Sequence, residues 1–276
     1  MVSVKQVKEF WENNPLWTGE SNYEPGTLEF FNEQRKIIET DGFAGKIDHR
    51  IFKPSLDKKI LDLGCGIGMW TTEFALRGYS NVHGADLTKR AIQLTNKRLE
   101  YYGLNAELSI QNAEKTNLLD KSFDHVNCLG VIHHTPDTES CISEIHRILR
   151  YNGTATISVY HKNIFLKLWT ILRPIGFLLF LGGAKLKGRK RENIFKLKRA
   201  DDIVRLYDGS ANPVGKAYSK NSFLNMLCPY FEIEEVFLHF FPARTLPFRI
   251  PKFIHRLLDK HLGFMICATL RKKCVE

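Results

Sequence analysis

The sequence lacks an apolar segment long enough to cross a bilayer. The best candidate, residues 163–184, is interrupted by Lys167, Arg173 and Pro174. This leaves about eleven unbroken apolar residues, against the roughly 20 that a spanning helix needs. The N-terminus carries scattered charges and lacks the apolar region of a secretory signal. We therefore expect a cytoplasmic protein, either free or associated with a membrane surface.

Cysteine is scarce and shows no pattern. The chain has neither a CxxC pair nor a regular disulfide framework, and several cysteines lie in apolar stretches where free thiols usually pack. This usage predicts a reducing compartment and no structural metal. The six residues concerned are Cys65, Cys128, Cys141, Cys228, Cys267 and Cys274.

Acidic residues are scarce in the second half of the chain. Residues 161–276 contain 22 Lys and Arg against 9 Asp and Glu (+13), whereas residues 1–160 contain 18 against 21 (−3), which together give the total of +10. Cations are densest from Lys185 to Arg199, a segment with eight Lys and Arg residues and a single acidic residue, Glu192. Such a run indicates an anionic neighbour, such as lipid headgroups, nucleic acid or an acidic substrate, or else a solvated loop.

Short apolar runs alternate with helical ones through the centre of the chain. Two helical patterns, at 4–13 and 28–40, come first. Strands are then predicted at 58–63, 81–86, 106–110, 123–129 and 154–160, and helices at 69–78, 88–103 and 138–153. This alternation predicts an α/β fold with a mostly parallel sheet and helices on both faces. Two more strands, at 231–241 and 263–272, flank a helix at 251–263.

These patterns divide the chain into four parts. Residues 1–54 form an N-terminal helical cap, and residues 55–160 form the α/β core. Residues 161–220 form an apolar and basic insertion, or lid, and residues 221–276 supply the strands that complete the sheet.

Three glycines follow the first strand in LDLGCGIG, residues 61–68. Gly64, Gly66 and Gly68 stand where an open parallel sheet binds its ligand. The sequence does not match the dinucleotide-binding fingerprint GxGxxG, because Met69 stands at the position of its last glycine. GxGxG preceded by Asp62 suits a ligand that lies close to the turn but carries no phosphate there.

The second strand ends in an acidic residue, Asp86, 24 positions after Asp62. A carboxylate at this place can accept hydrogen bonds from both hydroxyls of a ribose. The alternative is an aspartate that caps the helix beginning near Lys89. The glycine turn favours the ribose.

In their order and spacing, LDLGCGIG, GADLT, SFD, GVIHHTPD and LRYNGTATIS resemble class I S-adenosylmethionine-dependent methyltransferases. The type is that of the ubiquinone and menaquinone small-molecule enzymes. The resemblance covers residues 55–162 strongly and the last strands loosely. It implies a Rossmann-like, seven-stranded sheet with an antiparallel last strand, and S-adenosylmethionine as the cofactor.

The resemblance also implies roles for single residues. Cys65 and its flanking glycines would lie under the methionine part of the cofactor, Leu87 beside the adenine, and Asn112 at the position of an adenine-binding aspartate found in many relatives. Trp17 and Tyr23 are candidates for closing the site, and the alternative is that they are hydrophobic anchors of the first helices. The full set of cofactor candidates is Asp62, Gly64, Cys65, Gly66, Gly68, Asp86, Leu87, Asn112, Ala113, Cys128, Leu129, Gly130, Trp17 and Tyr23.

Three side chains are candidates for catalysis. His133 and His134 follow the fourth strand, where either could take a proton from the acceptor. Tyr160 ends the fifth strand. The alternative is that HHTPD only shapes the pocket and begins the next helix.

The apolar segment at 163–184 either lies in a bilayer surface or caps an apolar pocket. Both interpretations indicate a hydrophobic or amphiphilic small-molecule acceptor, methylated by in-line displacement. The first alternative is an RNA or other nucleic-acid methyltransferase that uses the basic lid, although no RNA-binding module or NPPY motif is present. The second is a non-catalytic binder of an adenosine ligand.

Overall fold

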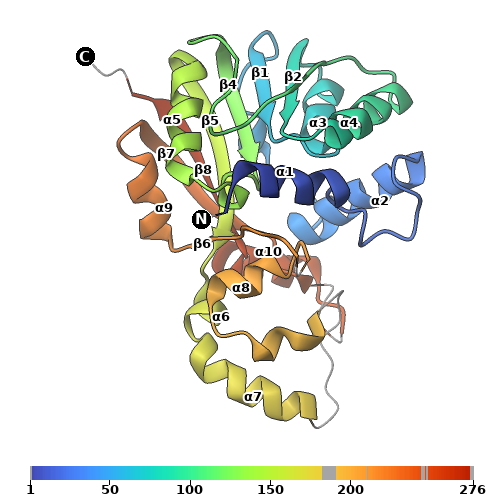
Figure 1. Cartoon of the computed structure of the whole chain (residues 1–276), viewed down its shortest axis with the longest axis vertical. Helices are drawn as coiled ribbons and strands as arrows, with labels where there is room; N and C mark the ends of the chain where they lie inside the picture. The colour runs from blue at the N-terminus through green and yellow to red at the C-terminus, as the bar shows by residue number, and fades with distance from the viewer. Residues whose placement is uncertain (1, 182–190, 210, 244–245, 247, 274–276) are drawn as a thin grey trace.

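The computed structural model describes residues 2–181, 191–209, 211–243, 246 and 248–273. Its centre is one sheet with the strand order β3-β2-β1-β4-β5-β8-β7 (Figure 1). A two-residue strand, β6 (Ala217–Tyr218), pairs with the end of β5. The other strands are β1 (Lys59–Leu63), β2 (Asn81–Asp86), β3 (Glu107–Ile110), β4 (Phe123–Leu129), β5 (Leu149–His161), β7 (Phe231–His239) and β8 (Met265–Lys272).

The pairing directions agree with the predicted fold class. Strands β1 to β5 pair in parallel, whereas β8 lies antiparallel between β5 and β7. The prediction of a mostly parallel sheet with an antiparallel last strand is confirmed. The sheet has eight strands rather than seven because Ala217 and Tyr218 pair with Tyr160 and His161.

Helices cover both faces of the sheet, as predicted. On one face, α5 (Thr138–Ile148) and α9 (Lys220–Leu227) bury Ile145 and Phe223 against the strands. On the other, α3 (Met69–Leu76) buries Phe74 with Phe43 and Ile51. The remaining helices of this core are α1 (Val4–Asn13), α2 (Leu28–Ile37), α4 (Lys89–Tyr101) and α10 (Lys252–Leu262).

Most predicted boundaries lie within a few residues of those observed, and the largest difference is between α5 and β5. The helix expected at 138–153 ends at Ile148, because Leu149 is fully buried, takes an extended conformation and pairs with Phe123 of β4. Asn152 then has a φ of 59°, and a Cβ on Gly153 would lie 2.8 Å from the carbonyl oxygen of Arg150. Gly153 therefore belongs to the first part of β5, where the pairing with β4 shifts register, and does not end the helix.

Between β5 and β6, the described residues form four helical elements. They are α6 (Ile164–Lys167), α7 (Trp169–Leu181), η4 (Arg191–Lys196) and α8 (Ala200–Arg205), and α7 forms the lower end of the molecule in Figure 1. Much of the basic run Lys185 to Arg199, residues 185–190, falls outside the described residues. Among the helices that the structure describes, none has the length and apolar character to cross a membrane.

Candidate active site

The turn between β1 and α3 depends on glycine. Gly64, Gly66 and Gly68 have φ values of 78°, 56° and 78°, in the left-handed region. The amides of Gly64 and Cys65 both donate to the carbonyl oxygen of Ala85, at 2.7 and 2.9 Å, which ties the turn to β2. A Cβ on Gly64 would lie 2.4 Å from Val131, whereas one on Gly66 would meet nothing within 4 Å. The open space above Gly66 is therefore available to a ligand.

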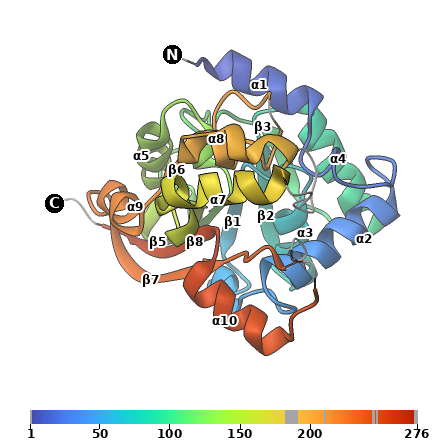
Figure 2. The ribbon, with the colours of Figure 1, turned by 90° about the horizontal axis from the view of Figure 1, so that it is seen from below.

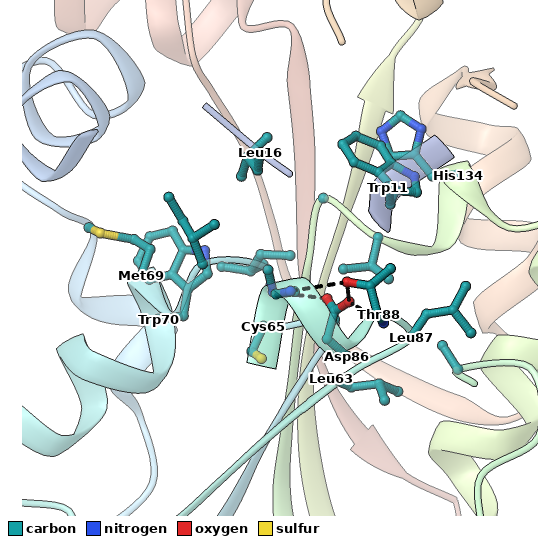
Figure 3. A pocket seen from close by; sticks show the side chains of 18 of the residues that line it. Trp11, Leu16, Leu63, Cys65, Met69, Trp70, Asp86, Leu87, Thr88 and His134 are labelled. Atoms are coloured by element: carbon teal, nitrogen blue, oxygen red, sulfur yellow. Dashed lines mark hydrogen bonds between the residues drawn. The ribbon is translucent and has the colours of Figure 1, made fainter. Parts of the chain in front are cut away.

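Asp86 lies beside this turn (Figure 3). Its Oδ2 accepts a hydrogen bond from the Gly66 amide at 3.0 Å, and its Oδ1 accepts from the amide and the hydroxyl of Thr88, both at 2.9 Å. Burial raises the pKa of the Asp86 carboxyl. Thr88, not Asp86, is the N-cap of α4. Thr88 therefore caps α4, the role that the sequence left open for Asp86.

A pocket with an empty volume of about 1020 Å³, including its open mouth, lies at the carboxyl ends of β1 to β4. Ten of the predicted site residues line it: Gly64, Cys65, Gly66, Asp86, Leu87, Asn112, Ala113, Leu129, Gly130 and His134. Parallel strands end at one edge of a sheet, which explains why residues far apart in the chain meet here. At the rim, Asn112 Oδ1 accepts from the Glu114 amide at 3.1 Å.

Three predicted residues lie beneath the pocket and do not line it. Gly68 is the N-cap of α3, and Cys128 is fully buried in the core. Asp62 accepts hydrogen bonds from Thr71 Oγ1 at 2.7 Å and from Asn127 Nδ2 at 2.8 Å. Burial raises the pKa of Asp62 to about 6. Asp62 therefore supports the turn from below.

We expect Asp62→Asn to reduce the change in the free energy of unfolding between pH 3.8 and about pH 6. The folded pKa is raised from 3.8 to about 6, so ionisation of Asp62 opposes folding. Its contribution to the free energy of unfolding falls as the pH rises from 3.8 to about 6, by up to about 3 kcal/mol. Urea denaturation across this range measures the slope, with the exposed Asp57→Asn as control. An equal slope in wild type and Asp62→Asn would contradict this.

The N-terminal segment contributes residues that the sequence analysis missed. Val7 and Trp11 of α1, with Leu16 after it, line the pocket. The carboxylate of Glu12 accepts from the amides of Lys89 and Arg90 at 3.0 Å each, which holds α1 against the N-terminus of α4. The spacing of Val7 and Trp11, one helical turn, is the signal that could have identified them.

The two aromatic residues predicted to close the site lie elsewhere. Trp17 donates from Nε1 to Glu33 at 3.1 Å and packs against a cluster around Phe30. Tyr23 is 49 % exposed. Neither lines the pocket.

The three catalytic candidates pack together at the end of β4 and β5. Only His134 lines the pocket, and Trp11 packs edge-on against its ring at 5.3 Å. The ring of His133 lies 4.1 Å from that of His134 and 4.2 Å from that of Tyr160. His133 is almost fully buried, which lowers its pKa well below the usual value. His133 and Tyr160 therefore form a second layer behind His134.

Asp208, from the loop after α8, completes this cluster. Its Oδ2 accepts from the Tyr160 hydroxyl at 2.9 Å and lies 3.4 Å from His134 Nε2. Burial raises the pKa of the Asp208 carboxyl, and also that of the Tyr160 phenol. His134 Nδ1 lies 2.8 Å from the carbonyl oxygen of Val214. Because a carbonyl can only accept, Nδ1 carries a hydrogen, which leaves Nε2, on the side of Asp208, as the nitrogen that can gain or lose a proton.

Comparison with known proteins agrees with this geometry. A family model described as "Methyltransferase domain" matches residues 60–153. The ubiquinone biosynthesis O-methyltransferase of Pseudomonas aeruginosa (strain UCBPP-PA14) is 29% identical over 216 residues, 73% of this chain and 84% of that protein. Phosphoethanolamine N-methyltransferase 2 of Caenorhabditis elegans is 33% identical over 133 residues, 48% of this chain and 28% of that protein.

Solved structures share the fold. An S-adenosylmethionine-dependent methyltransferase from Methanosarcina mazei superimposes with a TM-score of 0.55 at 22% identity, covering 81% of this chain and 95% of that one. One from Mesorhizobium loti gives 0.55 at 20% identity, covering 84% and 99%. The sheet order and the glycine turn define a Rossmann-like methyltransferase fold. The matched model identifies a methyltransferase domain at residues 60–153, and the fold is that of S-adenosylmethionine-dependent methyltransferases.

Proposed function

We propose that the pocket at the ends of β1 to β4 binds S-adenosylmethionine. The observation that carries the proposal is the approach of the Asp86 carboxylate to the Gly66 amide, 3.0 Å apart, at the wall of one pocket. Open space above Gly66 leaves room for the methionine part. Leu87 and the pair Asn112 and Ala113 line the region we assign to the adenine. When bound, the cofactor supplies an activated methyl group.

The Asp86 carboxylate can accept few additional hydrogen bonds from a ribose. Each carboxylate oxygen accepts about two hydrogen bonds. Oδ1 already accepts two from Thr88, and Oδ2 accepts one from Gly66. One ribose hydroxyl can therefore donate to Oδ2 without rearrangement, and a contact with both hydroxyls requires the Thr88 side chain to turn away.

We propose a hydrophobic or amphiphilic small molecule as the acceptor. The pocket wall beyond the glycine turn is largely apolar, with Leu16, Ile38, Trp70 and Val131 lining it. The names of two relatives refer to small molecules, one to ubiquinone biosynthesis and the other to phosphoethanolamine. An apolar wall excludes water and orients the acceptor for in-line displacement, which is the protein's main task in methyl transfer.

His134 is the group we propose to take a proton from a hydroxyl acceptor. It lines the pocket, and because Nδ1 donates to Val214, Nε2 is the nitrogen through which the ring would exchange a proton. Val214 holds the ring through Nδ1, while Asp208, anchored by Tyr160, lies on the Nε2 side. Asp208, Tyr160 and His133 are positioning residues in this scheme.

Calorimetry with S-adenosylhomocysteine tests cofactor binding on the pure protein. We expect saturable heat with one site per chain, followed by S-adenosylhomocysteine release when S-adenosylmethionine is mixed with a lipid extract. Release with tRNA, and none with lipid extract, would instead favour a nucleic-acid acceptor. Absence of heat with folded protein would overturn the proposed pocket.

A further inference from the structure

An apolar stripe on α6 and α7 is exposed at the surface of the described part of the chain. Its members follow one another at intervals of one, three or four residues, so they share one side of the helical path. Ile171 and Leu178 are 63% and 68% exposed. The stripe consists of Ile164, Phe165, Leu168, Ile171, Ile175, Leu178 and Leu181, all of them exposed.

The opposite side of α7 is occupied by η4. Trp169 stacks on Phe195 with ring centres 5.8 Å apart, and its Nε1 donates to the carbonyl oxygen of Leu197 at 2.8 Å. A Cβ on Gly176 would lie 2.1 Å from the Phe195 ring, so the glycine permits this close packing. The residues that line the pocket described above include none from 161–181. The apolar stripe therefore does not cap that pocket.

The exposed side of α10 combines apolar and cationic side chains. Phe253 and Leu257 are 72% and 58% exposed, and Lys252, Arg256 and Lys260 are exposed among them. The inner side is held by Asp259, which is buried and accepts from the Phe241 amide at 2.6 Å. The arrangement is that of a helix lying in a membrane interface.

The two helical regions are neighbours. Asn163 Nδ2, at the start of α6, donates to the carbonyl oxygen of Leu262 at the end of α10 at 3.2 Å. The rings of Phe165 and Phe264 stack at 6.4 Å. In Figure 1, α10 lies directly below the sheet and α7 at the lower end of the molecule. Seen from below in Figure 2, α7 is near the centre of the view and α10 at its lower edge.

Charge decides which partner fits this surface. Residues 161–181 contain Lys162, Lys167 and Arg173 and no acidic residue. The one acidic residue of α10 is the buried Asp259. A symmetric dimer through this surface would bring like charges together. An anionic bilayer instead accepts the apolar side chains and pairs with the cations. We propose that the exposed stripe of α6 and α7, together with Phe253, Leu257 and the three cations of α10, docks on an anionic lipid bilayer.

Sedimentation with vesicles tests this proposal. We expect the whole protein to bind vesicles of phosphatidylcholine with one-third phosphatidylglycerol, to bind pure phosphatidylcholine far less, and to dissociate at high salt. The double variant Ile171→Glu, Leu178→Glu should lower partitioning at least about tenfold. Changing Lys252, Arg256 and Lys260 to Gln should lower it about fivefold per charge.

Matched variants lie at the opposite edge of the sheet. Leu56 and Leu119 are 52% and 78% exposed and precede β1 and β4, so Leu56→Glu, Leu119→Glu should bind vesicles like wild type. Lys58, Lys97 and Lys121 changed to Gln serve as the charge control. Retained binding of S-adenosylhomocysteine shows that each variant is folded, independently of vesicle binding.

Three outcomes would overturn the proposal. The first is wild type that stays in the supernatant with anionic vesicles, and the second is equal vesicle binding by both sets of variants. A dimer in sedimentation velocity that the Ile171→Glu, Leu178→Glu variant dissociates, without vesicle binding, would identify the surface as a contact between two copies of the chain.

Discussion

Asp86→Ala is expected to weaken binding of S-adenosylhomocysteine by about 1 to 3 kcal/mol, or roughly 5- to 150-fold. The change removes the carboxylate proposed to hold the ribose. It also leaves the Gly66 amide and the Thr88 hydroxyl without the acceptor that now binds both. The turn should therefore lose order as well as a direct contact. Titration calorimetry measures the change in affinity.

Two further variants make this result specific. Asp57→Ala removes an exposed carboxylate outside the pocket and should bind like wild type. Asp86→Asn keeps one acceptor oxygen and should lose less affinity than Asp86→Ala. If Asp86→Ala binds S-adenosylhomocysteine as tightly as wild type, Asp86 does not hold the ribose.

Gly64→Ala is expected to lower the free energy of unfolding by about 2 to 5 kcal/mol. The left-handed conformation at φ 78° costs a residue with a Cβ about 1 to 2 kcal/mol. In addition, the new methyl would lie 2.4 and 2.6 Å from the two Cγ atoms of Val131, and such overpacking typically costs about 1 to 3 kcal/mol. Urea denaturation measures the difference.

Gly66→Ala provides the contrast, since it shares the conformation but not the collision. Its φ is 56°, and a Cβ there would meet nothing within 4 Å. We expect a loss of only about 1 to 2 kcal/mol in the free energy of unfolding. Because Gly66 lines the pocket, the methyl should nevertheless reduce S-adenosylhomocysteine binding. Equal destabilisation by the two variants would contradict this expectation, because it would mean that the Val131 side chain moves aside without lowering the free energy of unfolding.

Much of the fold follows from local patterns in the chain. The first helix spans Val4–Asn13 as predicted, because its apolar spacing and its Ser3 capping box both act within one or two turns. The alternation of strands and helices predicts parallel pairing, and parallel strands bring Gly64, Asp86, Asn112 and Gly130 to one edge. Ten predicted site residues consequently line one pocket.

Contacts between distant segments depend on packing that local patterns do not encode. Leu149 begins a strand rather than ending a helix because Phe123, 26 positions earlier, pairs with it. Asp208 reaches His134 only through the path of the chain between β5 and β6.

The sequence by itself determined the class of fold, the glycine turn and the acidic strand end, since each follows from the spacing of neighbouring residues. Only the tertiary structure decided that Trp11 and Leu16, not Trp17 and Tyr23, line the pocket. It also decided which apolar side of α7 is exposed. Trp169 and Gly176 lie on the other side, which packs against Phe195. A helix with apolar residues on both sides has no local preference for which side is buried, and its packing partner makes the choice.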